Sequence, residues 1–289
     1  MTLPTTDTRV GYPAGELAST GRVLHVEPLA DGGAVVLLDR TAFHPVDTAW
    51  PDQPADRGRM RWPGGEAEIV DGVTGGVHEG ALALGPDLPV RGGTPGWVFV
   101  VGHVLAGAGP AVGDTVEVEV DADHRLALSA GHTGCHLASL ALDAALAEAW
   151  TKPVRADALG HPGFDGAAIT SSRIEPWGSV DVYRVGRSLR KAGFTVAALD
   201  DPDAVAARAN ALLAAWVAAG AAIRIERDDD ALSARRSWVC ELPDAEARIP
   251  CGGTHLTSLA ELAAITVALE TAPVEGGLEL RMRTTVAPV

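Results

Sequence analysis

Two short segments, far apart in the chain, carry the side chains best suited to bind a metal ion. Residues 132–136 (HTGCH) contain two imidazoles four positions apart, which share one face if the segment is helical. Residues 251–255 (CGGTH) add a thiolate and a third imidazole. These are the donors that Zn²⁺ prefers in tetrahedral sites. The sequence therefore predicts a zinc site with four ligands: His132, His136, Cys251 and His255.

The ligand types leave the role of this site open. A site of three histidines and one cysteine is either catalytic or a purely structural tie, and ligand identity does not separate the two. The glycines between the second pair of ligands permit the tight backbone path that aims both at one ion. Cys135 would point about 100° round the helix from the histidine pair, and Cys240 lies in an apolar stretch, so we interpret both as core residues. Histidines without a partner at ligand spacing are interpreted as structural or exposed: His44, His78, His103, His124 and His161.

Composition limits the class of protein. A chain of 289 residues with 47% hydrophobic residues has enough material for one large domain or two ordinary ones. It has neither a long apolar run nor a basic and apolar start, which predicts a cytoplasmic protein without a membrane span or signal peptide. A formal net charge of −15 argues against binding nucleic acid, DNA included, through a broad basic surface.

The elements that must position the ligands fall into two predicted domains. Residues 1–125 show short β-rich runs separated by Gly, Pro and Asp, at 22–27, 34–38, 67–70, 97–101 and 115–120, which predicts a small β-barrel. Residues 126–289 mix helices and strands, which predicts an α+β domain with an antiparallel sheet. Fold class is therefore α+β with an N-terminal β-barrel.

Helix and strand signals in the second domain are uneven. An apolar stripe from Leu137 to Glu148 predicts a helix that begins near Gly131. Asp201-Pro202 and Gly220 predict the start and end of another helix. Strands are predicted at 223–227, 237–242 and 278–286, whereas residues 151–184 are rich in turn formers and stay unassigned. Asp228-Asp229-Asp230 is interpreted as a solvated acidic turn.

The two motifs, in this order and after a β domain, resemble the editing domain of alanyl- and threonyl-tRNA synthetases and the freestanding alanyl-tRNA editing proteins. Residues 248–255 (RIPCGGTH) match the second signature of that family, and residues 120–125 resemble the strand that leads into its histidine helix. Residues 43–45 (FHP) and 53–58 (QPADRG) resemble the Phe-Tyr-Pro and Gly-Gly-Gly-Gln-Pro-x-Asp-x-Gly segment of its β domain. Residues 46–52 depart from that pattern, because they are bulkier and acidic.

The resemblance implies roles for particular residues. It implies that His132, His136 and Thr133 serve catalysis, with Thr133 placed to sense a substrate hydroxyl. A basic cluster around Arg184 is predicted to contact tRNA, although a solvated helix face is an equal alternative. The residues predicted to bind substrate or tRNA are Gln53, Asp56, Arg187, Arg190, Lys191, Gly252 and Gly253.

The implied activity is hydrolysis of the ester of a mischarged aminoacyl-tRNA, in trans, with Zn²⁺ either activating water or positioning the substrate. The default substrate class is seryl-tRNA for alanine. A sharper alternative is that the altered segment 43–58 marks a specialist, such as a deacylase of fluorothreonyl-tRNA. Two alternatives stay open: a zinc-stapled module that binds aminoacyl-tRNA without turnover, and a hydrolase of small esters or amides. The oligomeric state is not predicted.

Overall fold

The computed structural model describes residues 3–48 and 50–289 and divides into two discontinuous compact units. The first comprises Met1–Leu126, Ile225–Ser237 and Pro250–Thr254, and the second comprises Ala127–Arg224, Trp238–Ile249 and His255–Val289. Ala49, in the segment that departs from the synthetase pattern, lies outside the described residues. A single boundary at residue 125 stays a prediction.

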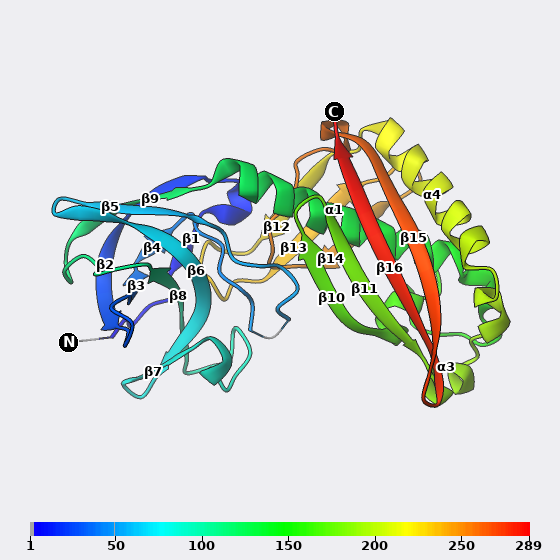
Figure 1. Ribbon diagram of the computed structural model, residues 1–289, viewed down its shortest axis with the longest axis horizontal. Helices are drawn as coiled ribbons and strands as arrows, with labels where there is room; N and C mark the ends of the chain where they lie inside the picture. The colour runs from blue at the N-terminus through cyan, green and yellow to red at the C-terminus, as the bar shows by residue number, and fades with distance from the viewer. Residues whose placement is uncertain (1–2, 49) are drawn as a thin grey trace. The chain divides into compact units, whose positions relative to one another are not determined.

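The first unit is built on a barrel-like sheet, which confirms the predicted β architecture (Figure 1). Its strands pair in the order β5-β9-β2-β3-β8-β6-β7, and a further β5–β6 pairing closes six of them into a ring. All these pairs are antiparallel. The bounds are β2 (Ala18–Pro28), β3 (Ala34–Leu38), β5 (Gly58–Trp62), β6 (Gly65–His78), β7 (Ala81–Leu84), β8 (Val98–Leu105) and β9 (Thr115–Val120).

Alternating side chains explain the ring. In β9 every second residue is a buried valine and the residues between are exposed, so one face of the strand turns inward. The barrel interior includes Phe43, Met60 and Ile69, all fully buried. Two short strands, β1 (Arg9–Val10) and β4 (Arg40–Thr41), pair in parallel in the same unit.

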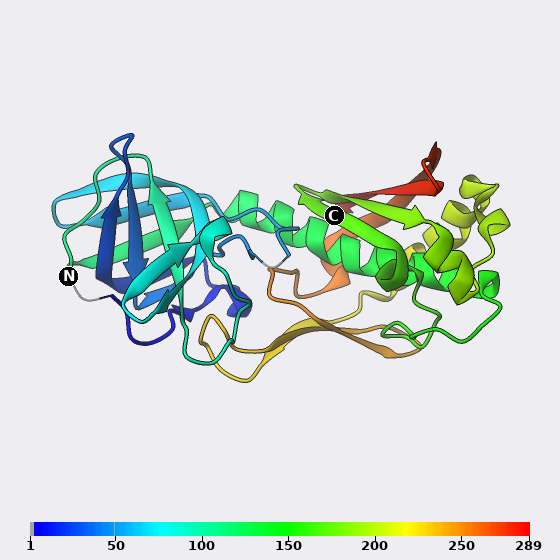
Figure 2. The same cartoon turned by 90° about the horizontal axis from the view of Figure 1, so that it is seen from below.

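The second unit contains a four-stranded antiparallel sheet in the order β10-β11-β16-β15, as the predicted fold class requires. Its strands are β10 (Ile169–Glu175), β11 (Gly178–Val185), β15 (Leu262–Val274) and β16 (Gly277–Pro288). A three-stranded sheet has the order β12 (Ile223–Arg227), β13 (Arg236–Glu241) and β14 (Glu246–Pro250). Figure 2 shows helix α1 (Ala122–Ala145) against the four-stranded sheet.

Helix α1 begins earlier than predicted. The sequence predicts a start near Gly131 and a strand over residues 120–125, but the strand ends at Val120. The reason is local, because Asp121 Oδ1 accepts a hydrogen bond from the backbone N–H of His124 at 3.0 Å and so caps the first turn. The prediction of a strand at 121–125 is therefore wrong.

The remaining helices are α2 (Phe164–Ala168), α3 (Arg187–Ala192) and α4 (Pro202–Ala219). The predicted signals of α4 are confirmed: Asp201 accepts from the N–H of Ala204, and Gly220 ends the helix at a φ of 61°. Short 3₁₀ helices occur at Tyr12–Ala14, Gly85–Asp87, Ala147–Ala149, Val196–Leu199 and Leu259–Glu261. Among the described residues, every helix is too short or too polar to cross a bilayer.

Candidate metal centre

Three imidazole rings meet where the two motifs converge. The ring centroids of His132 and His136 are 4.8 Å apart, one helical turn from each other on α1. The His255 ring lies 4.3 Å from that of His132 and 4.8 Å from that of His136. Trp238 is fully buried and packs edge-on to His136, with ring centroids 5.0 Å apart.

Cys251 completes the predicted ligand set. One ligand atom from each of His132, His136, Cys251 and His255 lies within 4.8 Å of all the others. Tetrahedral zinc with bonds of about 2.0–2.3 Å holds its ligand atoms roughly 3.3–3.7 Å apart. Small side-chain rotations would close this difference, so the cluster is compatible with a metal site.

The charge states of the donors suit a cation. Burial lowers the pKa of His136 to about 4, so its imidazole is neutral near pH 7. Its Nδ1 is buried and has no hydrogen-bond partner among the described residues. Burial above all raises the pKa of the Cys251 thiol to about 12. A bound metal would displace that proton, because thiolate is the coordinating form.

Two glycines let the histidine helix approach the sheet. A Cβ at Gly131 would stand 2.3 Å from the carbonyl oxygen of Glu175, and a Cβ at Gly134 would stand 2.5 Å from Val286. Both contacts are closer than real Cβ atoms show. Gly131 and Gly134 belong to the helical turn that carries His132. Their close contact with the sheet therefore fixes the rotation of α1 about its axis.

Thr133 holds the second motif against the first. Its Oγ1 lies 3.3 Å from Nδ1 of His255 and accepts a hydrogen bond from the N–H of Leu256 at 3.2 Å. The residue is fully buried. A contact to one ring nitrogen orients the imidazole and leaves the other nitrogen for an ion. Sensing of a substrate hydroxyl by Thr133 stays a prediction.

Gln53 makes a reciprocal pair with the loop that carries Cys251. Its Nε2 donates to Thr254 Oγ1 at 2.8 Å, and its Oε1 accepts from the N–H of Thr254 at 3.0 Å. Within the loop, the N–H of Gly253 points at Cys251 Sγ at 3.4 Å, whereas Gly252 is exposed. The contacts of Gln53 thus position the ligand loop, and its predicted role in substrate binding stays a prediction.

Asp56 lies in a buried ion pair. Its carboxylate pairs with the guanidinium of Arg125 through Nη2 and through Nε, the latter at 2.7 Å, and accepts from the N–H of His44 at 2.6 Å. Arg125 Nη2 also donates to the carbonyl of Ala42 at 2.8 Å. These contacts tie the segment 42–56 to the first turn of α1. Binding of substrate by Asp56 stays a prediction.

The predicted basic cluster lies on β11 and α3. Arg184, Arg187, Arg190 and Lys191 are all exposed. Arg184 Nη2 donates to the carbonyl of Glu275, and Arg190 Nη2 to that of Gly276 at 3.5 Å. Two of the four side chains therefore brace the β15–β16 turn, and contact with tRNA stays a prediction for the cluster.

The other cysteines lie outside the four-residue cluster found among the described residues. Cys240 is fully buried on β13, as predicted. Cys135 is half-buried and its thiol points at Asp181 Oδ1 at 3.5 Å. Cys135 belongs to a network of polar side chains from α1, β10 and β11, which no sequence pattern predicts.

Two buried histidines outside the cluster differ in their surroundings. Thr41 and the carbonyl of Val36 each contact a ring nitrogen of His103, at 2.8 and 3.0 Å, which makes this residue structural. Burial lowers the pKa of His44 to about 4, and its Nδ1 is buried with no hydrogen-bond partner among the described residues. His44 lines a cavity that sequence reasoning missed.

Comparison with known proteins agrees with the motifs. No family model matches the chain. It is 30% identical over 277 residues to the alanine–tRNA ligase of Frankia casuarinae, which is 92% of this chain and 27% of that protein. Shorter matches of 105 and 107 residues join it to the alanine–tRNA ligases of Caldivirga maquilingensis and Methanopyrus kandleri, at 36% and 39% identity. These matches cover 36% and 37% of this chain and 9% of each ligase.

The fold and the cluster thus define an α+β protein with a candidate metal centre. The chain is homologous over 92% of its length to alanine–tRNA ligases, of which it spans about a quarter. This relationship is consistent with the editing-domain family that the motifs predict.

Proposed function

We propose that this chain hydrolyses the ester bond of mischarged aminoacyl-tRNA at a zinc site. The observation that carries the proposal is the convergence of four zinc-type donors, from two motifs far apart in the sequence, within 4.8 Å. Homology to alanine–tRNA ligases over 92% of the chain supports aminoacyl-tRNA as the class of substrate.

The reaction requires little of the protein beyond positioning of the reacting groups. An aminoacyl ester is already activated, so the site must orient a water molecule and stabilise the developing oxyanion. When bound, zinc supplies Lewis-acid chemistry for either task. His132, His136, Cys251 and His255 would hold it, Thr133 would orient His255, and Gln53 would hold the loop of Cys251 in place.

We propose that the substrate is alanine tRNA mischarged with serine, or a tRNA charged with a threonine analogue, such as fluorothreonyl-tRNA. Another enzyme in the cytoplasm would charge this tRNA. The support for a specialised substrate is the segment of residues 46–52, which departs from the synthetase pattern. Asp47 and Thr48 of that segment line a cavity together with Cys251.

The test is release of amino acid from a panel of purified seryl-, alanyl-, glycyl-, threonyl- and fluorothreonyl-tRNAs, with and without a zinc chelator. Chelator-sensitive hydrolysis of one member is expected. Cys251→Ala should abolish it, and Cys240→Ala, which removes a buried thiol outside the cluster, should retain it. Hydrolysis that survives chelation and Cys251→Ala would overturn the zinc-dependent mechanism.

A second candidate follows from the number of ligands. Four protein donors fill a tetrahedral shell, and a closed shell is typical of structural zinc. This favours a zinc-stapled module that binds aminoacyl-tRNA without turnover. Zinc-dependent binding of every panel member, with no release of amino acid from any, would support it over the deacylase.

A further inference from the structure

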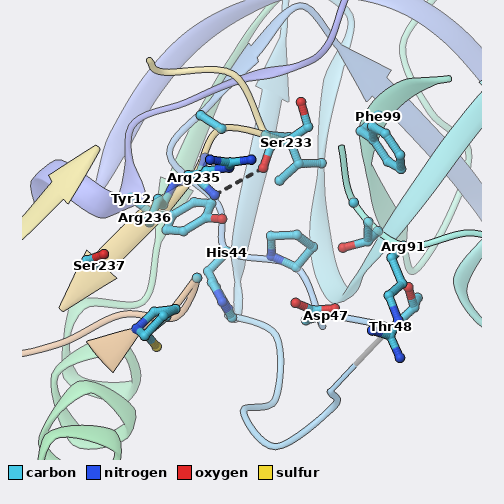
Figure 3. A pocket seen from close by; sticks show the side chains of 18 residues that line it. Tyr12, His44, Asp47, Thr48, Arg91, Phe99, Ser233, Arg235, Arg236 and Ser237 are labelled. Atoms are coloured by element: carbon cyan, nitrogen blue, oxygen red, sulfur yellow. Dashed lines mark hydrogen bonds between the residues drawn. The ribbon is translucent and has the colours of Figure 1, made fainter. Parts of the chain in front are cut away.

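The first unit contains a cavity of about 540 Å³ whose wall includes the Cys251 loop. Figure 3 shows Tyr12, His44, Asp47 and Arg236 around it, with Arg91 and Phe99 also at its wall. Pro250, Cys251 and Gly252 close one side. The volume is in the range of sites for small organic ligands, and a ligand bound here would lie beside a predicted metal ligand.

Arg236 is the feature that points to a ligand. It is 8% exposed, its Nη1 donates to the carbonyl of Leu232 at 3.0 Å, and its Nη2 donates to that of Ala231. Its Nε is buried and has no hydrogen-bond partner among the described residues. A buried donor without an acceptor is costly to maintain, so a site built around one commonly has an acceptor supplied from outside.

The surroundings indicate which acceptor. The Arg236 guanidinium lies over the Tyr12 ring at 5.5 Å, so the ring helps to fix its plane. Two exposed arginines, Arg91 and Arg235, also line the cavity. Three arginines around one cavity, in a chain with a net charge of −15, make a local site for an anion. Planar guanidinium groups match phosphate oxygens in geometry as well as in charge.

The other lining groups fit a nucleoside. Leu232, which is half-buried, and Pro250, which is exposed, offer apolar surface for a base. Asp47 is a carboxylate on the wall, and carboxylates in nucleotide sites accept hydrogen bonds from ribose hydroxyls. The Nδ1 of His44, buried and without a partner among the described residues, is a further polar group for the ligand.

We propose that this cavity binds the terminal nucleotide of tRNA, with the 5′-phosphodiester of the terminal adenosine on Arg236, Arg91 and Arg235. The proposal rests on the proposed deacylase function for the identity of the ligand. The aminoacyl ester is carried on the ribose of that nucleotide, so a ribose beside Cys251 would bring the ester next to a predicted metal ligand.

The experiment titrates the dinucleotide cytidylyl-(3′→5′)-adenosine, which carries that phosphodiester, into the zinc-loaded full chain by calorimetry. Adenosine alone and AMP serve as comparison ligands. The dinucleotide should bind at least about tenfold more tightly than adenosine, because it adds charge-assisted hydrogen bonds. AMP binding far more tightly than the dinucleotide would overturn the assignment in favour of a free nucleotide.

Variants test the arginines. Arg236→Gln should lower affinity for the dinucleotide about tenfold and leave affinity for adenosine unchanged. Arg91→Ala, at an exposed position whose change does not threaten folding, should lower it about threefold. Arg22→Ala, an exposed arginine of the same unit outside the cavity, should have no effect. Absence of dinucleotide binding, or equal binding by all variants, would overturn the proposal.

The two proposals fail separately. If the chain hydrolyses aminoacyl-tRNA while dinucleotide binding ignores Arg236 and Arg91, the nucleotide cavity is wrong and the deacylase stands. If the dinucleotide binds through these arginines while no aminoacyl-tRNA is hydrolysed, the cavity is supported and the deacylase is wrong.

Discussion

Helix α1 contributes to two clusters of buried polar side chains, and they differ in how fully the protein satisfies them. In the cluster of His132 and His136, three imidazoles and a thiol converge and the Nδ1 of His136 has no partner among the described residues. In the cluster around Asp181, the carboxylate accepts from Ser172 at 2.6 Å and Ser179 at 2.9 Å. An unsatisfied group among convergent donors indicates a ligand, whereas a satisfied network indicates structure.

The satisfied network extends along α1 to further acids. Tyr183 donates to Asp165 at 3.0 Å, and the N–H of Asp165 donates to Asp143 at 2.7 Å. Burial raises the pKa of Asp143 to about 8 and that of Asp165 to about 6. Hydroxyl and amide donors thus hold these carboxyls in place, and we assign the network to stability.

Loss of a metal ligand should have the largest effect, and it should act on zinc affinity. His132→Ala, His136→Ala and Cys251→Ala should each lower zinc affinity more than about 100-fold, beyond the range that outer partners of a metal site give. Metal analysis of the purified variants measures this. Cys240→Ala should keep its zinc, and stoichiometric zinc in Cys251→Ala would refute the ligand assignment.

The matching change in the other cluster is Asp181→Ala. It leaves the hydroxyls of Ser172 and Ser179 without their acceptor, so the free energy of unfolding should fall by about 1–3 kcal/mol. Denaturant titration measures the loss, and zinc content should stay that of the wild type. If Asp181→Ala lost zinc as the ligand variants do, the two clusters would be one functional unit.

Thr133 allows a finer test. Thr133→Val keeps the shape of the side chain and deletes the hydroxyl that contacts His255 and Leu256, so zinc affinity should fall about tenfold. Thr133→Ser keeps the hydroxyl and should behave as the wild type in a chelator competition. Unchanged zinc affinity in Thr133→Val, with altered choice among the aminoacyl-tRNAs, would instead support the substrate-sensing role.

A further effect concerns pH and accumulates over several pH units. Because the pKa of Asp143 is about 8 in the folded chain, against 3.8 for an ordinary Asp, the folded state holds a proton that the unfolded chain releases. The free energy of unfolding therefore falls as pH rises between these values, by about 1 kcal/mol per pH unit from this group. Asp143→Asn should flatten the curve, matching the wild type near pH 4 and exceeding its stability above pH 8. If the free energy of unfolding fell with pH at the same rate in the wild type and in Asp143→Asn, the raised pKa of Asp143 would be contradicted.

Local signals made some elements predictable. The N-terminal cap and proline of α4 and the glycine after it define the helix without help from the rest of the chain, and the structure confirms them. The sequence does not predict the strands β10, β11 and β15, because their stability comes from pairing with β16 and with each other. Strand preference depends on such partners more than on intrinsic propensity.

The same distinction holds for the site. The ligand motifs are short and chemically specific, so the sequence predicts the four residues that cluster in the structure. The network around Asp181 joins residues of α1, β10 and β11, and no local pattern announces it. Arg236 did leave a signal, because it shares a period of two with the buried Trp238 and Cys240 on β13, which places an arginine on an inward face.

The deacylase proposal depends on His132, His136, Cys251 and His255 together binding zinc. X-ray absorption at the zinc edge of the zinc-loaded chain tests it most directly. We expect one sulfur at about 2.3 Å and three nitrogens at about 2.0–2.1 Å. A shell without sulfur, or a folded chain that takes up no zinc, would contradict it.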